Sequence, residues 1–136
     1  EREFRAQLGD NNWLIGTWDR VDEVEGKWRL VDYKTSAVAD QEAADRRAGE
    51  SRQLVLYAMA LESTVGVRPA ETCPDFLGSG LVGRATPQER DFSRLRGEVR
   101  RAAVGIRERD YEPNPSYRNC INCAYRAYCE ASAVGP

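Results

Sequence analysis

The stretch WLIGTWDRVDEVEGKWRLVDYKTS, residues 13–36, predicts a hairpin of two antiparallel strands that turns at Glu25-Gly26. The stretch is rich in Trp, Val, Ile, Leu and Tyr, which favour strands. With Glu25 and Gly26 as the two turn residues, the pairing places Asp19 directly opposite Asp32. Opposed Cβ atoms in an antiparallel pair lie about 4.5–5.5 Å apart. The hairpin therefore predicts two carboxylates at close range.

Two facing carboxylates need a neutralising partner, because like charges directly opposite each other destabilise a sheet. Lys34 follows Asp32 by two residues, so it projects from the same face and can offset one charge. A divalent cation could offset both, and carboxylate oxygens are the hard ligands that Mg²⁺ prefers. The alternative is a register slipped by one residue, with Asp19 and Asp32 facing solvent, because Glu-Gly is a weaker turn signal than Asn-Gly.

The same register places Asp22 opposite Arg29. Asp22 is an odd number of residues from Asp19, so its side chain points to the other face of the strand. We therefore predict an ordinary cross-strand ion pair for Asp22, with a structural role.

The composition excludes several classes of chemistry. At 136 residues the chain has the length of one domain, and we expect a single domain over 1–136, cut from a longer protein. It contains no histidine, which excludes His-based triads and His metal ligands. Nothing resembles a G-x-x-x-x-G-K-[ST] loop, so an ATP-driven motor would lie outside these residues. Without a secretory signal or a run of about 18 apolar residues, we expect a cytoplasmic protein with no membrane partner.

The order of predicted elements favours an α/β fold in which helices cover a mixed central sheet. The region 35–50 is expected to be loop, since Gly49 argues against a continuous helix. The tail is expected to be loop followed by a short helical turn around the cysteines. Strands are predicted at 2–8, 13–24, 27–34 and 76–84, and helices at 51–63 and from the capping box at 86–89 to about 109.

Three motifs, taken in order, closely resemble the RecB-type nucleases of the PD-(D/E)xK superfamily. They are GTWDRVD at 16–22, LVDYKTS at 30–36 and QLVLY at 53–57. The resemblance implies a restriction-endonuclease-like core and a site that binds Mg²⁺ or Mn²⁺ through two carboxylates and a backbone carbonyl. Carried over, the catalytic residues are Asp19, Asp32, Lys34, Gln53 and Tyr57, and the metal ligands are Asp19, Asp32 and the carbonyl of Tyr33.

The resemblance also implies an activity and partners. It implies a metal-dependent deoxyribonuclease in a helicase–nuclease or recombination-repair protein. The implied partners are DNA and a helicase or ATPase motor, which would lie in the same chain or in the same complex. Relatives often carry a further His and acidic residue before the first strand, and this chain has no His. A catalytically incomplete DNA-binding or scaffolding module of the same fold therefore stays open. Gln53 and Tyr57 could likewise be a capping amide and a half-buried ring.

The cysteine spacing Cys120-x₂-Cys123-x₅-Cys129 predicts a metal site, with 117–130 as its motif. By resemblance to iron–sulfur RecB-type nucleases of the AddB-like kind, these three thiolates hold a [4Fe-4S] cluster with a fourth cysteine far upstream. Zinc in a Cys₃ or Cys₄ site is the alternative, which would make the chain a zinc-stapled interaction domain. Cys73 is expected to be free and partly buried, and the alternative is that it completes a Cys₄ site.

Charge is unevenly spread along the chain. Residues 1–45 carry 6 Lys and Arg against 11 Asp and Glu, whereas residues 84–109 carry 8 Arg against 4 acidic residues. An acidic pocket beside a basic face is one interpretation, and ordinary solvated surface is the other. Arg90, Arg94 and Arg101 fall near one face of the second predicted helix. They are candidates for DNA phosphate contacts, or for a solvated or docking surface.

Overall fold

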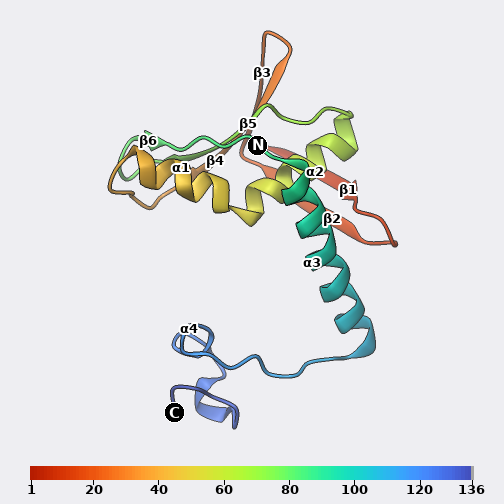
Figure 1. Cartoon of the computed structure of the whole chain (residues 1–136), viewed down its shortest axis with the longest axis vertical. Helices are drawn as coiled ribbons and strands as arrows, with labels where there is room; N and C mark the ends of the chain where they lie inside the picture. The colour runs from red at the N-terminus through yellow and green to blue at the C-terminus, as the bar shows by residue number, and fades with distance from the viewer. Residues whose placement is uncertain (136) are drawn as a thin grey trace. The chain divides into compact units, whose positions relative to one another are not determined.

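The computed structural model describes residues 1–135, and its chain divides into two compact units, Glu1–Ala103 and Val104–Pro136. Figure 1 shows the elements of the first unit, in which strands and helices alternate after an initial run of strands. The bounds are β1 Arg2–Gln7, β2 Trp13–Trp18, β3 Arg20–Val24, β4 Lys27–Lys34, α1 Gln41–Glu50, α2 Arg52–Val65, β5 Glu71–Phe76, β6 Leu81–Val82 and α3 Glu89–Glu108.

The β3–β4 hairpin has the predicted register, with Val24 paired with Lys27 and Arg20 with Val31. Glu25 and Gly26 both have positive φ, at 53° and 75°, which is the requirement of a two-residue type I′ turn. The single strand predicted at 13–24 is instead two strands, because the chain bends between Trp18 and Arg20. β2 pairs with β1, and β3 pairs with β4.

A mixed sheet with helices beside it forms the body of this unit, as predicted. Its strand order is β3-β4-β5-β6, in which β4 and β5 are parallel and the other pairs antiparallel. Parallel neighbours need a crossover connection, and α1 and α2 supply it. α2 contacts β1, β4 and β5, while α1 contacts β5 and β6. The crossover therefore lays both helices on the face of the sheet that carries Asp32.

Two further predicted elements differ from the structure. The region expected to be loop contains α1, whose first turn is capped because the Asp40 side chain accepts from the N–H of Ala43 at 2.8 Å. Gly49 is tolerated in its last turn, and the break falls two residues later at Ser51. The strand predicted at 76–84 lies earlier, as β5, and residues 77–80 form the turn to β6.

The core lies between α2, α3 and the strands β1, β2 and β4. Phe4 and Trp18 stack with ring centroids 4.5 Å apart, and the edge of Tyr57 meets Phe4 at 5.7 Å. Phe92 of α3 is fully buried, and the guanidinium of Arg68 lies 4.2 Å from its ring centroid. The aromatic core thus fixes the start of β1, the end of β2 and the middle of α2 relative to one another.

The second unit contains the end of α3, the short helix α4 at Tyr117–Cys120 and a 3₁₀ turn at Arg126–Tyr128. Ser116 caps α4 by accepting from the N–H of Asn119 at 3.1 Å. The predicted tail of loop and helical turn is therefore present. Within residues 1–135, no helix is both long and apolar enough to cross a bilayer.

We predict that Gly83→Ala lowers the free energy of unfolding by about 2 kcal/mol or more. The added Cβ would collide with the backbone carbonyl of Ala44, where α1 crosses β6, and backbone on both sides would have to move. Gly49→Ala is the matched control, since nothing lies within 4 Å of its Cβ position. This control should leave stability unchanged or raise it by up to about 1 kcal/mol. Urea denaturation measures both, and equal effects would show that α1 does not approach β6 so closely.

Candidate active site

Asp32 is a buried carboxylate in the middle of the sheet. It lies on β4 and is 3% exposed. The Nζ of Lys34 lies 2.6 Å from its Oδ2, which is an ion pair by distance. No hydrogen bond of acceptable angle reaches that oxygen within the described residues. Lys34 therefore compensates the Asp32 charge by a close ion pair rather than by a well-directed hydrogen bond.

Lys34 is fixed from a second side by the first turn of α2. Its Nζ donates to Gln53 Oε1 at 2.7 Å, and Gln53 Nε2 donates to the hydroxyl of Tyr57 at 3.0 Å. Ser51 caps α2 through the N–H of Leu54 at 3.3 Å, which sets the position of Gln53 within the first turn. Gln53 and Tyr57 are four residues apart and share one helix face. The structure thus joins four of the predicted catalytic residues in a continuous chain of polar contacts.

Asp19 lies at the bend between β2 and β3 rather than within a strand. Its Oδ2 accepts from the backbone N–H of Tyr33 at 2.8 Å, so its carboxylate reaches β4 at the residue next to Asp32. The neighbouring Trp18 is 2% exposed, and its indole N–H donates to the carbonyl of Tyr57 at 3.3 Å. Because Trp18 is anchored in the core, the position of Asp19 is fixed by the same contacts as that of Tyr57.

The glycine of the first motif has a packing reason. The ring of Phe4 lies against Gly16, and a Cβ added there would come within 2.8 Å of the Cζ of Phe4. That ring is the one that stacks on Trp18. The glycine three residues before Asp19 thus allows the aromatic contact that holds the bend in place.

The opposite face of the sheet carries a different set of charges. The predicted ion pair between Asp22 and Arg29 does not form, although the two residues are opposite each other as expected. Asp22 instead binds Arg20 at 2.8 Å, and Arg29 binds Glu71 of β5 at 3.0 Å. The hydrogen bond to Asp22 raises the pKa of Arg20 above its usual range. Asp22 is therefore engaged in a surface ion pair, away from the Asp32 face.

The donor set of this site suits a hard cation. Asp19 and Asp32 present carboxylate oxygens beside the Tyr33 peptide, and one oxygen of Asp32 is buried without a hydrogen bond. Oxygen ligands with room for water are what Mg²⁺ requires. Within residues 1–135 no group of three or more Cys, Asp and Glu side chains gathers closely enough to hold a metal ion. The candidate site therefore rests on two carboxylates.

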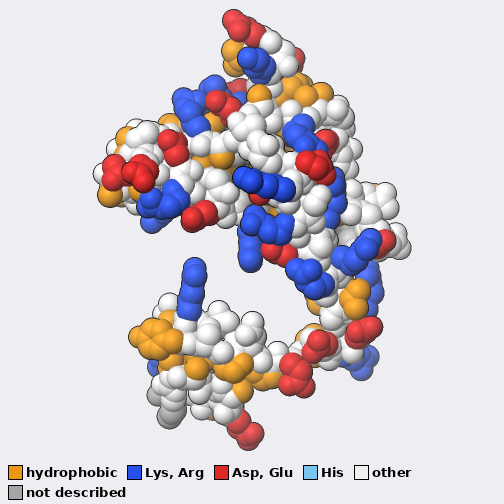
Figure 2. Space-filling view, viewed as in Figure 1, with side chains coloured by type: hydrophobic (Ala, Val, Ile, Leu, Met, Phe, Trp, Pro, Cys, Tyr) orange, Lys and Arg blue, Asp and Glu red, His pale blue; other side chains and the backbone are white. Residues whose placement is uncertain are grey.

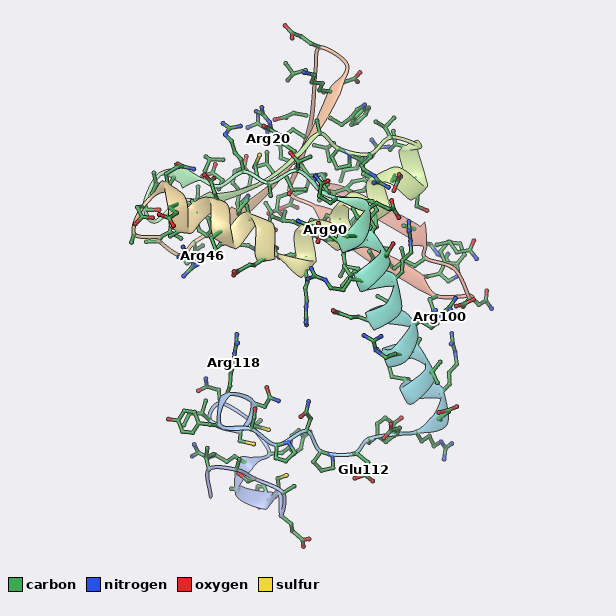
Figure 3. The ribbon with its side chains drawn as sticks, in the orientation of Figure 1. Arg20, Arg46, Arg90, Arg100, Glu112 and Arg118 are labelled. Carbon is green, nitrogen blue, oxygen red and sulfur yellow. The ribbon has the colours of Figure 1, made fainter. Side chains whose placement is uncertain are left out.

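The predicted DNA-contacting arginines are all exposed on α3. Arg90 and Arg94 line a cavity of about 550 Å³ together with Gly49, Glu50, Asp91 and Arg52. Arg94 lies 3.7 Å from Asp91, while Arg101 does not line this cavity. Figure 3 shows Arg90 beside the first turn of α3. Sequence reasoning missed Arg52, although its place next to Gln53 could have indicated that it borders the site.

The cysteines fall into two environments. Cys73 is free and 1% exposed on β5, and burial raises the pKa of its thiol. In the second unit, the N–H of Ala133 donates to Cys120 Sγ at 3.5 Å and lowers the pKa of that thiol. Cys123 and Cys129 are free and more exposed, and within residues 1–135 the three cysteines of the predicted metal site do not gather closely enough to hold an ion. Hydrogen bonding therefore favours a thiolate at Cys120, whereas burial disfavours one at Cys73.

We predict that Lys34→Ala lowers the free energy of unfolding by about 1–3 kcal/mol, since it leaves the buried Asp32 charge without its partner. Adding Asp32→Asn should recover part of that loss, because no charge then remains to be compensated. Arg46→Ala, which removes an exposed pair with Glu42 at 3.9 Å, should change stability by less than about 0.5 kcal/mol. Denaturant titration in the absence of divalent cations measures the cycle, and additive effects would refute the coupling.

The sequence also matches known proteins. The family model of the PD-(D/E)XK nuclease superfamily matches residues 1–130. The chain is also 27% identical over 136 residues to the Gene 69 protein of Mycobacterium phage D29. That match covers 95% of this chain and 46% of the phage protein, so the chain spans about half the length of the curated relative it matches. With nearly its whole length matched, the chain belongs to the PD-(D/E)XK nuclease superfamily.

Proposed function

We propose that the chain is a RecB-type, metal-dependent deoxyribonuclease that hydrolyses phosphodiester bonds at the Asp19, Asp32 and Lys34 site. The observation that carries the proposal is the polar chain from Asp32 through Lys34 to Gln53 and Tyr57. It contains a buried carboxylate oxygen without a hydrogen bond, next to the peptide that Asp19 contacts.

In this proposal Asp19 and Asp32, with the Tyr33 carbonyl, would hold Mg²⁺ or Mn²⁺. When bound, the cation supplies Lewis-acid stabilisation of the phosphate and an acidified water. Lys34 places its ammonium beside Asp32, where it can orient the attacking water or stabilise charge on the phosphate oxygens. Gln53 holds that ammonium through its Oε1, and Tyr57 holds the amide of Gln53 in turn. Gln53 and Tyr57 therefore act here as positioning residues.

The proposed substrate strand continues over the cavity lined by Arg52, Arg90 and Arg94. Arg52 directly precedes Gln53, so the cavity adjoins the helix end that contacts Lys34. Guanidinium groups bind phosphate oxygens without regard to base sequence. Arg101 lies further along α3, outside the residues that line this cavity, and would contact a more distant phosphate.

The same resemblance sets the wider context of the proposal. A RecB-type domain works with a helicase or ATPase motor, in the same chain or in a complex, during DNA repair or recombination. The cysteines Cys120, Cys123 and Cys129 would hold a [4Fe-4S] cluster that pins the C-terminal unit. Cys120 already accepts a backbone N–H, an arrangement that stabilises a sulfur ligand carrying negative charge.

A specific observation favours a second candidate function. Within the described residues no third acidic side chain joins Asp19 and Asp32. A DNA-binding or scaffolding module that keeps the fold without cleavage would have this arrangement. DNA binding without cleavage by the full-length protein would support it.

We predict Mg²⁺- or Mn²⁺-dependent cleavage of DNA by the full-length protein. Asp19→Asn, Asp32→Asn and Lys34→Ala should each lower the rate by about 100-fold or more, because they remove the charges that act on the phosphate. Asp22→Asn is the matched control, since this aspartate pairs with Arg20 on the other face, and it should retain activity. Gel analysis of labelled DNA, with EDTA as a blank, measures the rates. Equal activity of Asp22→Asn and Asp32→Asn would refute the assignment.

We predict iron and acid-labile sulfide in about equal amounts in the full-length protein purified without oxygen. Cys123→Ser should lose most of the iron, because it removes one of three proposed ligands. Cys73→Ser should keep it, since Cys73 is buried on β5 with a raised pKa. Elemental analysis gives the metal content, and zinc without iron would identify the alternative zinc site.

A further inference from the structure

The second unit, Val104–Pro136, exposes an unusual set of tyrosine rings. Four of the six tyrosines of the chain lie there, and each is at least 70% exposed. Figure 2 shows hydrophobic side chains on the surface of this unit. Large apolar groups gathered on a surface often mark a binding site. The rings are Tyr111 at 72%, Tyr117 at 70%, Tyr125 at 75% and Tyr128 at 89% exposure.

These rings do not serve the packing of their own unit. In the described part of the unit, none of them stacks on another aromatic ring or on an arginine, in contrast to Phe4 and Trp18 of the first unit. Instead, backbone hydrogen bonds hold the turns that carry them. The N–H of Ile121 donates to the carbonyl of Tyr117 at 2.9 Å, and that of Tyr128 to the carbonyl of Tyr125 at 3.0 Å. The rings are therefore presented outward by an ordered backbone.

The second unit as a whole carries four arginines and four acidic residues, but the part that bears Tyr117, Tyr125 and Tyr128 is positively charged. Residues 113–129 contain two arginines and no acidic residue. Arg126 is held by the carbonyl of Ile121 at 3.2 Å, while Arg118 is exposed and enters no ion pair in the described residues. Figure 3 shows Arg118 extending from α4 away from the rest of its unit. Each arginine directly follows a tyrosine in the sequence, as Tyr117-Arg118 and Tyr125-Arg126.

We propose that Tyr117 and Tyr125, each followed by an arginine, form a base-stacking surface for single-stranded DNA. The proposal rests on the proposed function, which makes DNA the substrate. Exposed rings on a segment with two arginines and no acidic residue fit a partner with flat apolar faces and negative charge, and single-stranded nucleic acid has both. A duplex offers its phosphates but not its base faces, because those are already stacked. The segment thus binds a strand that has been opened.

The tyrosine surface is proposed to bind bases, whereas the arginine cavity of the first unit is proposed to bind phosphates. Oligonucleotides with and without bases therefore distinguish the two. The full-length protein, with Lys34→Ala to prevent cleavage and purified without oxygen, is titrated with oligothymidylate. A second titration uses an abasic oligonucleotide with the same number of phosphates. Fluorescence anisotropy without divalent cations gives both affinities. The intact oligonucleotide should bind at least about fivefold more tightly, as expected for one stacked base or more.

Tyr117→Ala and Tyr125→Ala should each lower affinity for the intact oligonucleotide by about fivefold or more and leave the abasic one unchanged. Tyr117→Phe should keep the preference, because phenylalanine retains the ring. Arg90→Ala is the matched control, and it should weaken both oligonucleotides alike by removing a phosphate contact.

Three outcomes would overturn the base-stacking surface. The first is an unchanged preference for bases in both alanine variants. The second is equal weakening of both oligonucleotides by those variants. The third is a fall in melting temperature of several degrees, which would show that the rings are packed within the protein. If DNA cleavage depends on Asp32 but the tyrosine variants bind both oligonucleotides as the unsubstituted protein does, the base-stacking surface is refuted and the proposed nuclease function stands. Failure to bind or cleave any DNA would refute the proposed function as well.

Discussion

The cost of burying the Asp32 carboxylate decides how the site is built. An ionised group that is 3% exposed must be compensated, because burial removes its hydration. Lys34 supplies the compensating charge from the same face of β4, and its ammonium is held in turn by Gln53 of α2. Tyr57, which binds Gln53, accepts the indole N–H of Trp18 at its carbonyl. One buried charge thus links β4, α2 and β2, the three elements that define the candidate active site.

The parts of the site that the sequence predicts are those governed by local periodicity. The two-residue turn fixes the hairpin register, so Arg20 and Val31 pair as expected. The period of two along a strand places Asp32 and Lys34 on one face. The helical period places Gln53 above Tyr57. Contact between strand and helix, such as that from Lys34 to Gln53, has no periodic signal, and the resemblance to known nucleases indicated only that both residues belong to the site.

The errors arise where a distant partner decides the outcome. The long strand predicted at 13–24 breaks at Asp19 because its first half pairs with β1 and its second half with β4. Arg29 turns away from Asp22 because Glu71 of β5, a strand that was placed too late in the chain, offers it a carboxylate. The helix at 41–50 was not predicted because Gly49 argued against a continuous helix, whereas in the structure the Asp40 side chain caps its first turn.

Asp22 and Asp32 lie in the same hairpin but have different surroundings. This difference distinguishes a carboxylate with a structural role from one that is proposed to take part in catalysis. Asp22 forms a well-directed contact with Arg20 near solvent, where such a pair contributes little to stability. Asp32 is buried against the ammonium of Lys34 at 2.6 Å, next to the peptide that Asp19 contacts. A divalent cation bound by Asp32 and Asp19 would offset the repulsion between these two carboxylates. Binding of the ion would then also raise the free energy of unfolding, by an amount that grows with the occupancy of the site.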